Sequence, residues 1–163
     1  MTTPRKFIPN ISSKERFENN LKHLVEREGR TIPDDFDIDE IHWATDRIGI
    51  TDYEGCSEAV IHGYFTINVA GELDSSADIE TDISPGSGTV KDDLTELAAL
   101  MDQVLKDDDQ IKIVVHCAMG MERSPLTVVW YLHTKLGKTL DEAYDIVMNA
   151  RASVVDRRSW INS

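Results

Sequence analysis

The chain has 163 residues, with 17 Lys or Arg against 30 Asp or Glu, so its formal charge is −13. Its length suits one domain, since domains typically hold about 100–150 residues. Apolar residues make up 40% and charged residues 29% of the chain, which is ordinary for a folded globular protein. Nucleic acids and anionic membrane surfaces attract clustered Lys and Arg, so we expect neither as a partner of so acidic a chain.

The cysteine content and the hydropathy pattern indicate where the protein works. The chain holds two cysteines, Cys56 and Cys117, which is too few for a disulfide framework and favours a reducing compartment. No signal peptide is visible in residues 1–10, and the most apolar run, residues 125–132, is shorter than the ~20 residues that a membrane span needs. We therefore expect a cytoplasmic protein.

The first half of the chain contains one helical pattern and two strand patterns. A capping box and apolar residues at helical spacing predict a helix within residues 12–29. The acidic residues 34–40 predict an exposed loop. Residues 47–51 and 64–70 are rich in β-branched and aromatic side chains and predict strands. Residues 71–91, rich in Ser, Asp, Gly and Thr, predict a functional loop or a spacer.

The second half alternates between helix and strand. An apolar stripe predicts a helix with Asp92 or Asp93 as its N-cap, and residues 111–115 predict a central strand covered on both faces. Ser124 followed by proline predicts the N-cap of a further helix, and a capping box over residues 139–142 predicts the start of another. This alternation predicts an α/β domain with a central, mostly parallel sheet flanked by helices.

The loop between the predicted central strand and the next helix is the most informative segment. The strand leads into His116 and Cys117, five residues follow, and Arg123 and Ser124 open the helix. A loop that wraps onto a helix N-terminus presents backbone N–H groups to an anion, and Gly120 permits the positive φ that such a loop needs. Arg123 supplies a planar fork for two phosphate oxygens, and the positive field favours the thiolate of Cys117. The segment therefore predicts a phosphoryl-transfer site.

These residues resemble the Cys-x5-Arg signature of the cysteine-based protein phosphatases, in their dual-specificity branch. Within residues 116–124, the sequence HCAMGMERS has His, Cys, Gly, Arg and Ser all in register. The sequence TINVA at residues 66–70 resembles a buried strand of that family. Arg151 resembles the Arg of a recurring Arg-Pro pair, with Ala152 in place of the proline. The resemblance covers roughly residues 41–160 and implies a phosphate-binding loop between a central strand and the following helix.

The resemblance also implies a role for each residue of the loop. Cys117 would attack phosphorus to form a cysteinyl-phosphate, and Arg123 would stabilise the phosphoryl oxygens together with the loop amides. Ser124 would hydrogen-bond the sulfur, and His116 would orient the loop. No metal ion and no cofactor is implied. The expected substrate-binding residues are His116, Ala118, Met119, Gly120, Met121, Glu122 and Arg123.

The family uses an Asp on a separate loop as general acid and then as base for water. Asp82 is the first candidate, because it precedes Ile-Ser-Pro-Gly, which resembles an Asp-Gly-Pro-Gly turn of some bacterial members. Asp74, Asp78 and Asp92 are the alternatives.

Two features of the loop bear on the substrate. Glu122 stands beside the arginine, where this branch commonly has a small residue; its carboxylate either faces solvent or weakens the positive field. The loop also lacks the lysines that lipid and RNA-end phosphatases tend to place there. We therefore expect a phosphatase of phosphotyrosine and phosphoserine/threonine, with phosphorylated proteins as partners.

Two other functions remain open at this stage: a phosphatase of non-protein phosphoesters, such as an RNA 5′ end or an inositol lipid, and a phosphate-binding pseudophosphatase. We assign residues 1–40 to an N-terminal helix and acidic loop, and residues 41–163 to the catalytic domain, within one compact domain.

Overall fold

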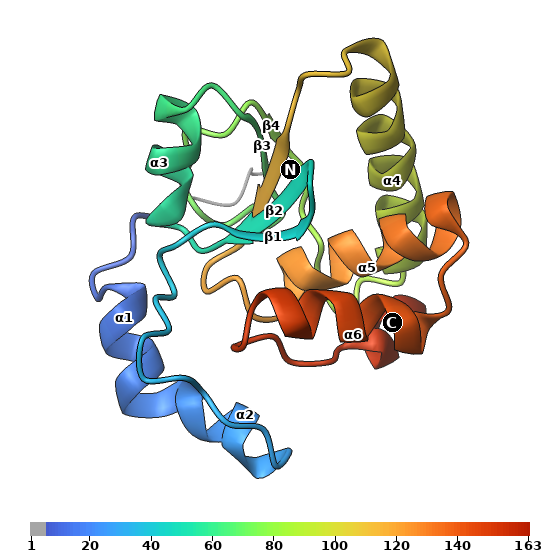
Figure 1. The fold of residues 1–163 in the computed structure, drawn as a ribbon. Helices are drawn as coiled ribbons and strands as arrows, with labels where there is room; N and C mark the ends of the chain where they lie inside the picture. Colours follow the sequence, from blue (N-terminus) through green and yellow to red (C-terminus); the bar gives the residue numbers. More distant parts are fainter. Residues whose placement is uncertain (1–5) are drawn as a thin grey trace.

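The computed structural model describes residues 6–163, and a mixed five-stranded sheet runs through its centre (Figure 1). The strands are β1 (His42–Thr45), β2 (Ile48–Thr51), β3 (Phe65–Asn68), β4 (Ile79–Glu80) and β5 (Ile113–His116). Their order across the sheet is β1-β2-β5-β3-β4. β1 pairs antiparallel with β2, and every other neighbouring pair is parallel. The predicted α/β fold with a mostly parallel sheet is confirmed, and the three predicted strands correspond to β2, β3 and β5.

Helices cover both faces of this sheet (Figure 1). α3 (Gly55–Ile61) packs against β3 and β5 on one face, whereas α4 (Val90–Asp107), α5 (Arg123–Leu136) and α6 (Leu140–Ala150) pack together on the other. A short 3-10 helix, η2 (Arg158–Asn162), contacts α4. Within residues 6–163, no helix combines the length and the apolar character that crossing a membrane requires.

The central strand β5 is buried along its whole length, because helices lie on both sides of it. The main hydrophobic core gathers side chains from the sheet and from the three helices on its second face, among them Ile50, Ile67, Leu97, Val115, Val128 and Val147. This core holds the carboxyl end of β5 in a fixed position, which is where the chain turns into the loop at residues 117–122.

α4 begins three to four residues earlier than the sequence predicts. Its first residue is Val90 and its N-cap is Thr89, whereas Asp92 and Asp93 lie inside the first turn. Val90 is fully buried, so packing against the core draws it into the helix. The two aspartates keep a favourable place, since negative charge near a helix N-terminus opposes the positive end of the helix dipole.

The N-terminal helical segment packs against the loop that follows β5. It consists of α1 (Ser13–Arg16), a π-helical turn η1 (Phe17–Leu21) and α2 (Lys22–Arg27), and the Ser12 hydroxyl accepts the Glu15 amide at its start. A second hydrophobic cluster joins this segment to the loop; its buried members are Phe17, Val25, Ile38, Met119, Met121 and Val155. The segment therefore covers the methionine side chains of the loop.

We expect Phe17→Ala to lower the free energy of unfolding by about 3–5 kcal/mol, the usual cost of removing a buried phenylalanine. Phe17 is 2% exposed, and its loss would leave a cavity beside the loop methionines. Urea denaturation measures the change. Phe7, which is 50% exposed, offers the control Phe7→Ala, and that variant should lose less than about 1 kcal/mol. Equal losses in the two variants would contradict the role given to this cluster.

Candidate active site

The loop at residues 117–122 connects the end of β5 to the start of α5, and its carbonyl groups are held from outside. Four consecutive carbonyls accept hydrogen bonds from donors elsewhere in the chain. These bonds run from Tyr53 N to Ala118 O (3.1 Å), from Arg151 Nη2 to Met119 O (3.0 Å), from Arg151 Nε to Gly120 O (2.9 Å) and from Val155 N to Met121 O (2.8 Å). In a trans peptide the C=O and the next N–H point in opposite directions, so the amides of residues 119–122 face inward. Such a ring of amides is an anion cradle.

Arg151 is the main support of this loop. Its side chain is fully buried and donates as well to Ile38 O at 2.8 Å and to Glu40 O at 3.1 Å, which ties the loop to the N-terminal part of the chain. Burial lowers the pKa of Arg151 to about 10, which leaves it charged at neutral pH. Gly120 fits beneath it with φ of +66°, and a Cβ there would lie 2.5 Å from Thr51 O. Glycine is therefore required at this position for both its φ angle and its lack of a side chain.

Cys117 lies at the start of the loop with its side chain buried, and its Sγ is 3.2 Å from Ser124 Oγ. The sequence predicts Ser124 as the N-cap of the next helix, and this is wrong: α5 begins at Arg123, and Ser124 lies in its first turn. The Ser124 hydroxyl is directed to the sulfur instead of to the helix amides. A hydroxyl in that position stabilises negative charge on sulfur by hydrogen bonding.

His116 is held in one tautomer by two hydrogen bonds. Its Nδ1 lies 3.0 Å from the carbonyl oxygen of Cys117, which only accepts, so Nδ1 carries the proton. Its Nε2 lies 2.7 Å from Ser75 Oγ. Burial lowers the pKa of His116 and outweighs the opposing effect of the bond to Cys117, so the ring is neutral and Nε2 accepts the Ser75 hydroxyl. His116 therefore orients the backbone at Cys117, and Ser75 is a support that sequence reasoning missed.

Arg123 is clamped by Glu72, which sequence reasoning also missed. Nη1 donates to Glu72 Oε2 at 2.9 Å and Nη2 donates to Glu72 Oε1 at 2.6 Å. This pair uses two of the roughly five N–H donors of the guanidinium and leaves the others for a ligand. Burial acts to raise the pKa of Glu72, but the hydrogen bonds and charge of Arg123 outweigh it and lower that pKa overall. The clamp fixes the plane of the arginine beside the loop.

The four candidates for a general acid lie in different surroundings. Asp82 is exposed, accepts the Gly71 amide at 3.2 Å and the Ser84 hydroxyl at 2.7 Å, and its charge helps to raise the pKa of Arg123. The carboxylate of Asp78 accepts both the amide and the hydroxyl of Thr66, so it fastens the segment before β4 to β3. Asp74 is exposed, and Asp92 lies in the first turn of α4.

Glu122 forms an ion pair with Arg157, whose Nε lies 2.7 Å from Glu122 Oε2. Arg157 therefore offsets the negative charge of Glu122. The ion pair joins the loop to the segment after α6. The neighbouring Arg158 pairs with Asp141 and Asp156.

The chain shares a sequence family with known enzymes. A family model described as the catalytic domain of dual specificity phosphatases matches residues 66–163. The chain belongs to the dual specificity phosphatase family. The match includes the whole loop, Glu72 and Asp82, and leaves out β1, β2 and the residues around Thr51 that support the loop. No curated protein matches the chain in sequence.

Solved structures share the fold at low sequence identity. Human DUSP28 is 15% identical with a TM-score of 0.61, over 74% of this chain and 86% of that one. A mouse putative dual specificity phosphatase, complexed with zinc tungstate, is 19% identical with a TM-score of 0.59, over 80% and 86% of the two chains. The human tyrosine phosphatase-like serine/threonine/tyrosine-interacting protein is 15% identical with a TM-score of 0.63, over 74% and 90%. These likenesses confirm the phosphatase fold.

We expect Glu72→Gln to lower the free energy of unfolding at neutral pH by about 1–2 kcal/mol, because a mostly buried guanidinium loses its charged partner; partial exposure of Glu72 reduces the effect. The folded pKa of Glu72 lies below its ordinary value, so the carboxylate stabilises the fold above that value and less so as the pH falls through the folded pKa. The gap between wild type and Glu72→Gln should therefore shrink in acid. Urea denaturation of both proteins at neutral pH and at about pH 3 measures this gap.

Glu58→Gln is the matched control for this experiment, because Glu58 pairs with His62 on the exposed surface. It should change stability by less than about 1 kcal/mol. A gap for Glu72→Gln that stays constant from neutral pH to about pH 3 would contradict the charged clamp.

Proposed function

We propose that this chain is a phosphoprotein phosphatase that hydrolyses phosphotyrosine and phosphoserine/threonine through a cysteinyl-phosphate intermediate. The observation that carries the proposal is the arrangement at the start of α5. A buried cysteine sulfur lies 3.2 Å from a hydroxyl, at the base of a loop whose carbonyls at residues 118–121 are held from outside. An oxyanion and a nucleophile would meet in this loop.

In the first step, the thiolate of Cys117 attacks phosphorus and an S–P bond forms. The bond from phosphorus to the substrate oxygen breaks, its electron pair goes to that oxygen, and Asp82 supplies the proton. The inward amides and Arg123 stabilise the charge on the phosphoryl oxygens. The side chains of Met119 and Met121 pack into the second hydrophobic cluster, the one that contains Phe17. These two residues therefore act on the phosphate through their backbone amides.

In the second step, water attacks phosphorus and gives its proton to the Asp82 carboxylate. The S–P bond breaks, and its electron pair returns to the sulfur of Cys117, where the Ser124 hydroxyl stabilises the thiolate. His116 stays neutral in both steps and holds the backbone at Cys117 through its bond to the carbonyl.

The substrate class rests on charge. The chain carries a net charge of −13 and its loop has no lysine, which disfavours polyanions such as an RNA end or an inositol lipid as substrates. A phosphorylated protein presents one phosphate to the loop. The cytoplasmic location and the absence of nucleic-acid partners stay predictions from the sequence, as does the division at residues 40 and 41.

We expect Cys117→Ser to lower phosphate release from a phosphotyrosine peptide by at least about 10⁴-fold, since the nucleophile is lost. Tungstate should still raise the Tm of this variant, because the amides and Arg123 remain. Cys56→Ser is the matched control and should keep most of the activity. Equal turnover by wild type and Cys117→Ser would contradict the mechanism. Tungstate binding without turnover by the wild type would favour the pseudophosphatase alternative.

We expect Asp82→Asn to slow hydrolysis of phosphoserine and phosphotyrosine peptides by about 10²–10⁴-fold, the usual contribution of a general acid. The loss should be much smaller with an activated aryl phosphate, whose leaving group hardly needs a proton. Steady-state kinetics on both substrates measures the difference. Asp74→Asn is the control, because Asp74 is exposed in the same loop region. The assignment would be wrong if Asp74→Asn, and not Asp82→Asn, showed this pattern.

A further inference from the structure

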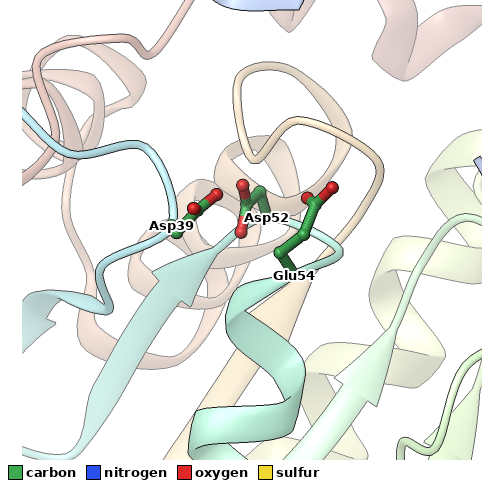
Figure 2. Close-up of side chains that lie close together, drawn as sticks. All are labelled: Asp39, Asp52 and Glu54. Atoms are coloured by element: carbon green, nitrogen blue, oxygen red, sulfur yellow. The ribbon is translucent and has the colours of Figure 1, made fainter. Parts of the chain in front are cut away.

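Three carboxylates converge on the outer side of the loop (Figure 2). Asp39 comes from the segment before β1, Asp52 follows β2, and Glu54 directly precedes α3. One oxygen of each lies within 4.8 Å of the other two. The proposed chemistry uses none of these side chains.

Two oxygens of this cluster are buried without a hydrogen-bond partner among residues 6–163. They are Asp39 Oδ1 and Asp52 Oδ2. Asp52 is 0% exposed, and its other oxygen accepts the Gly55 amide at 2.8 Å. An unpaired buried carboxylate oxygen is costly, so two of them within one small space call for either a cation or a proton between them.

The side-chain cations nearby do not supply this positive charge directly. Arg151 directs its N–H groups to Ile38 O, Glu40 O, Met119 O, Gly120 O and the ring of His42. A guanidinium has about five N–H donors, so none remains for a carboxylate. Lys14 lies 3.4 Å from Asp39 Oδ2 and 3.5 Å from Asp37 Oδ1, with 59% of its side chain exposed. Glu54 accepts the amide and hydroxyl of Ser13, which are neutral.

We propose that Asp39, Asp52 and Glu54 bind one hard divalent cation, of which Ca²⁺ fits best. The donors are all carboxylate oxygens, which hard cations prefer. One oxygen of each carboxylate lies within 4.8 Å of the other two, close enough for one cation to contact all three. Ca²⁺ accepts several protein carboxylates in flexible geometry, whereas Mg²⁺ usually keeps several waters and binds one or two carboxylates. Burial and the hydrogen bond with Asp39 raise the pKa of Asp52 to about 9, so a bound cation would take the place of the proton on Asp52. The Asp39 side chain is 30% exposed, which gives water access to complete the coordination.

The position of the site gives the cation a structural task. Tyr53 lies between two of the ligands in sequence, and its amide donates to Ala118 O; Ser13, which binds Glu54, also donates to Ala118 O at 3.3 Å. A cation shared by Asp39 and Glu54 would join the segment before β1 to the start of α3, next to Tyr53, whose amide holds the loop. It would stabilise the loop from outside, without contact with the substrate.

The test uses the full chain, treated with a chelator, dialysed and kept at fixed ionic strength. Isothermal titration calorimetry with CaCl₂ and with MgCl₂ should show one site, with a Kd of about 10⁻⁵–10⁻³ M for Ca²⁺ and weaker binding of Mg²⁺. Ca²⁺ should raise the Tm by about 5–10 °C once it exceeds the Kd by about 100-fold. Tighter binding of Mg²⁺ than of Ca²⁺ would overturn the choice of Ca²⁺.

Two ligand variants and one control separate coordination from general attraction. Asp39→Asn and Glu54→Gln should each weaken Ca²⁺ binding by about 100-fold or more, the upper end of the usual cost of losing an outer contact of a metal site. Asp37→Asn removes one negative charge from the same surface but leaves the three ligands in place. This control should therefore bind Ca²⁺ with nearly the affinity of the wild type. Equal weakening by Asp37→Asn would overturn the proposal in favour of diffuse attraction.

Absence of any saturable heat and of any Tm shift in the wild type would also overturn the proposal. A proton shared by Asp39 and Asp52 would then occupy the space. All of these outcomes are independent of phosphatase activity.

Discussion

The direction of the peptide groups in residues 118–121 is the constraint on which the proposed chemistry depends. Isolated peptides have no reason to turn four successive carbonyls the same way, because backbone groups seek partners on every side. Here the partners are Tyr53 just after β2, Arg151 at the C-cap of α6 and Val155 beyond it, and all are outside the loop. With the carbonyls satisfied there, the amides remain for an oxyanion, and no rearrangement is needed when one arrives.

The parts of the site that follow one another in the chain could be predicted from the sequence. The run from His116 to Ser124 forms a strand end, a loop and a helix start, and each of these has a local signature. β2, β3 and β5 were predicted because they are buried and apolar. β1, β4 and α3 were not, since β1 is only half-buried, β4 has two residues, and α3 has seven residues and an N-cap, Glu54, that makes no capping hydrogen bond.

The supports of the site could not be predicted in the same way, because they join residues far apart in the chain. Glu72 clamps Arg123 and Ser75 binds His116, each across more than forty residues. No local pattern records such pairs. One indirect signal was available: Glu72 and Ser75 follow the predicted strand at 64–70, and parallel neighbours end at the same edge of a sheet, where their following residues meet. The proposed N-cap at Ser124 failed for a related reason, since the sulfur of Cys117 engages the hydroxyl that the cap would have used.

The contacts of Arg151 and Val155 with the loop have a consequence for how the protein is made. Both residues lie about thirty positions after the loop that they hold, while Ile38 and Glu40, which share Arg151, lie far before it. A ribosome adds the chain from its N-terminus, so β5 and Cys117 emerge while the donors for Met119, Gly120 and Met121 are still unmade. The anion cradle is thus completed late in synthesis, and contacts of such long range also form slowly in a folding chain. A nascent chain would carry the proposed nucleophile before the loop could take the shape on which the proposed phosphate binding depends.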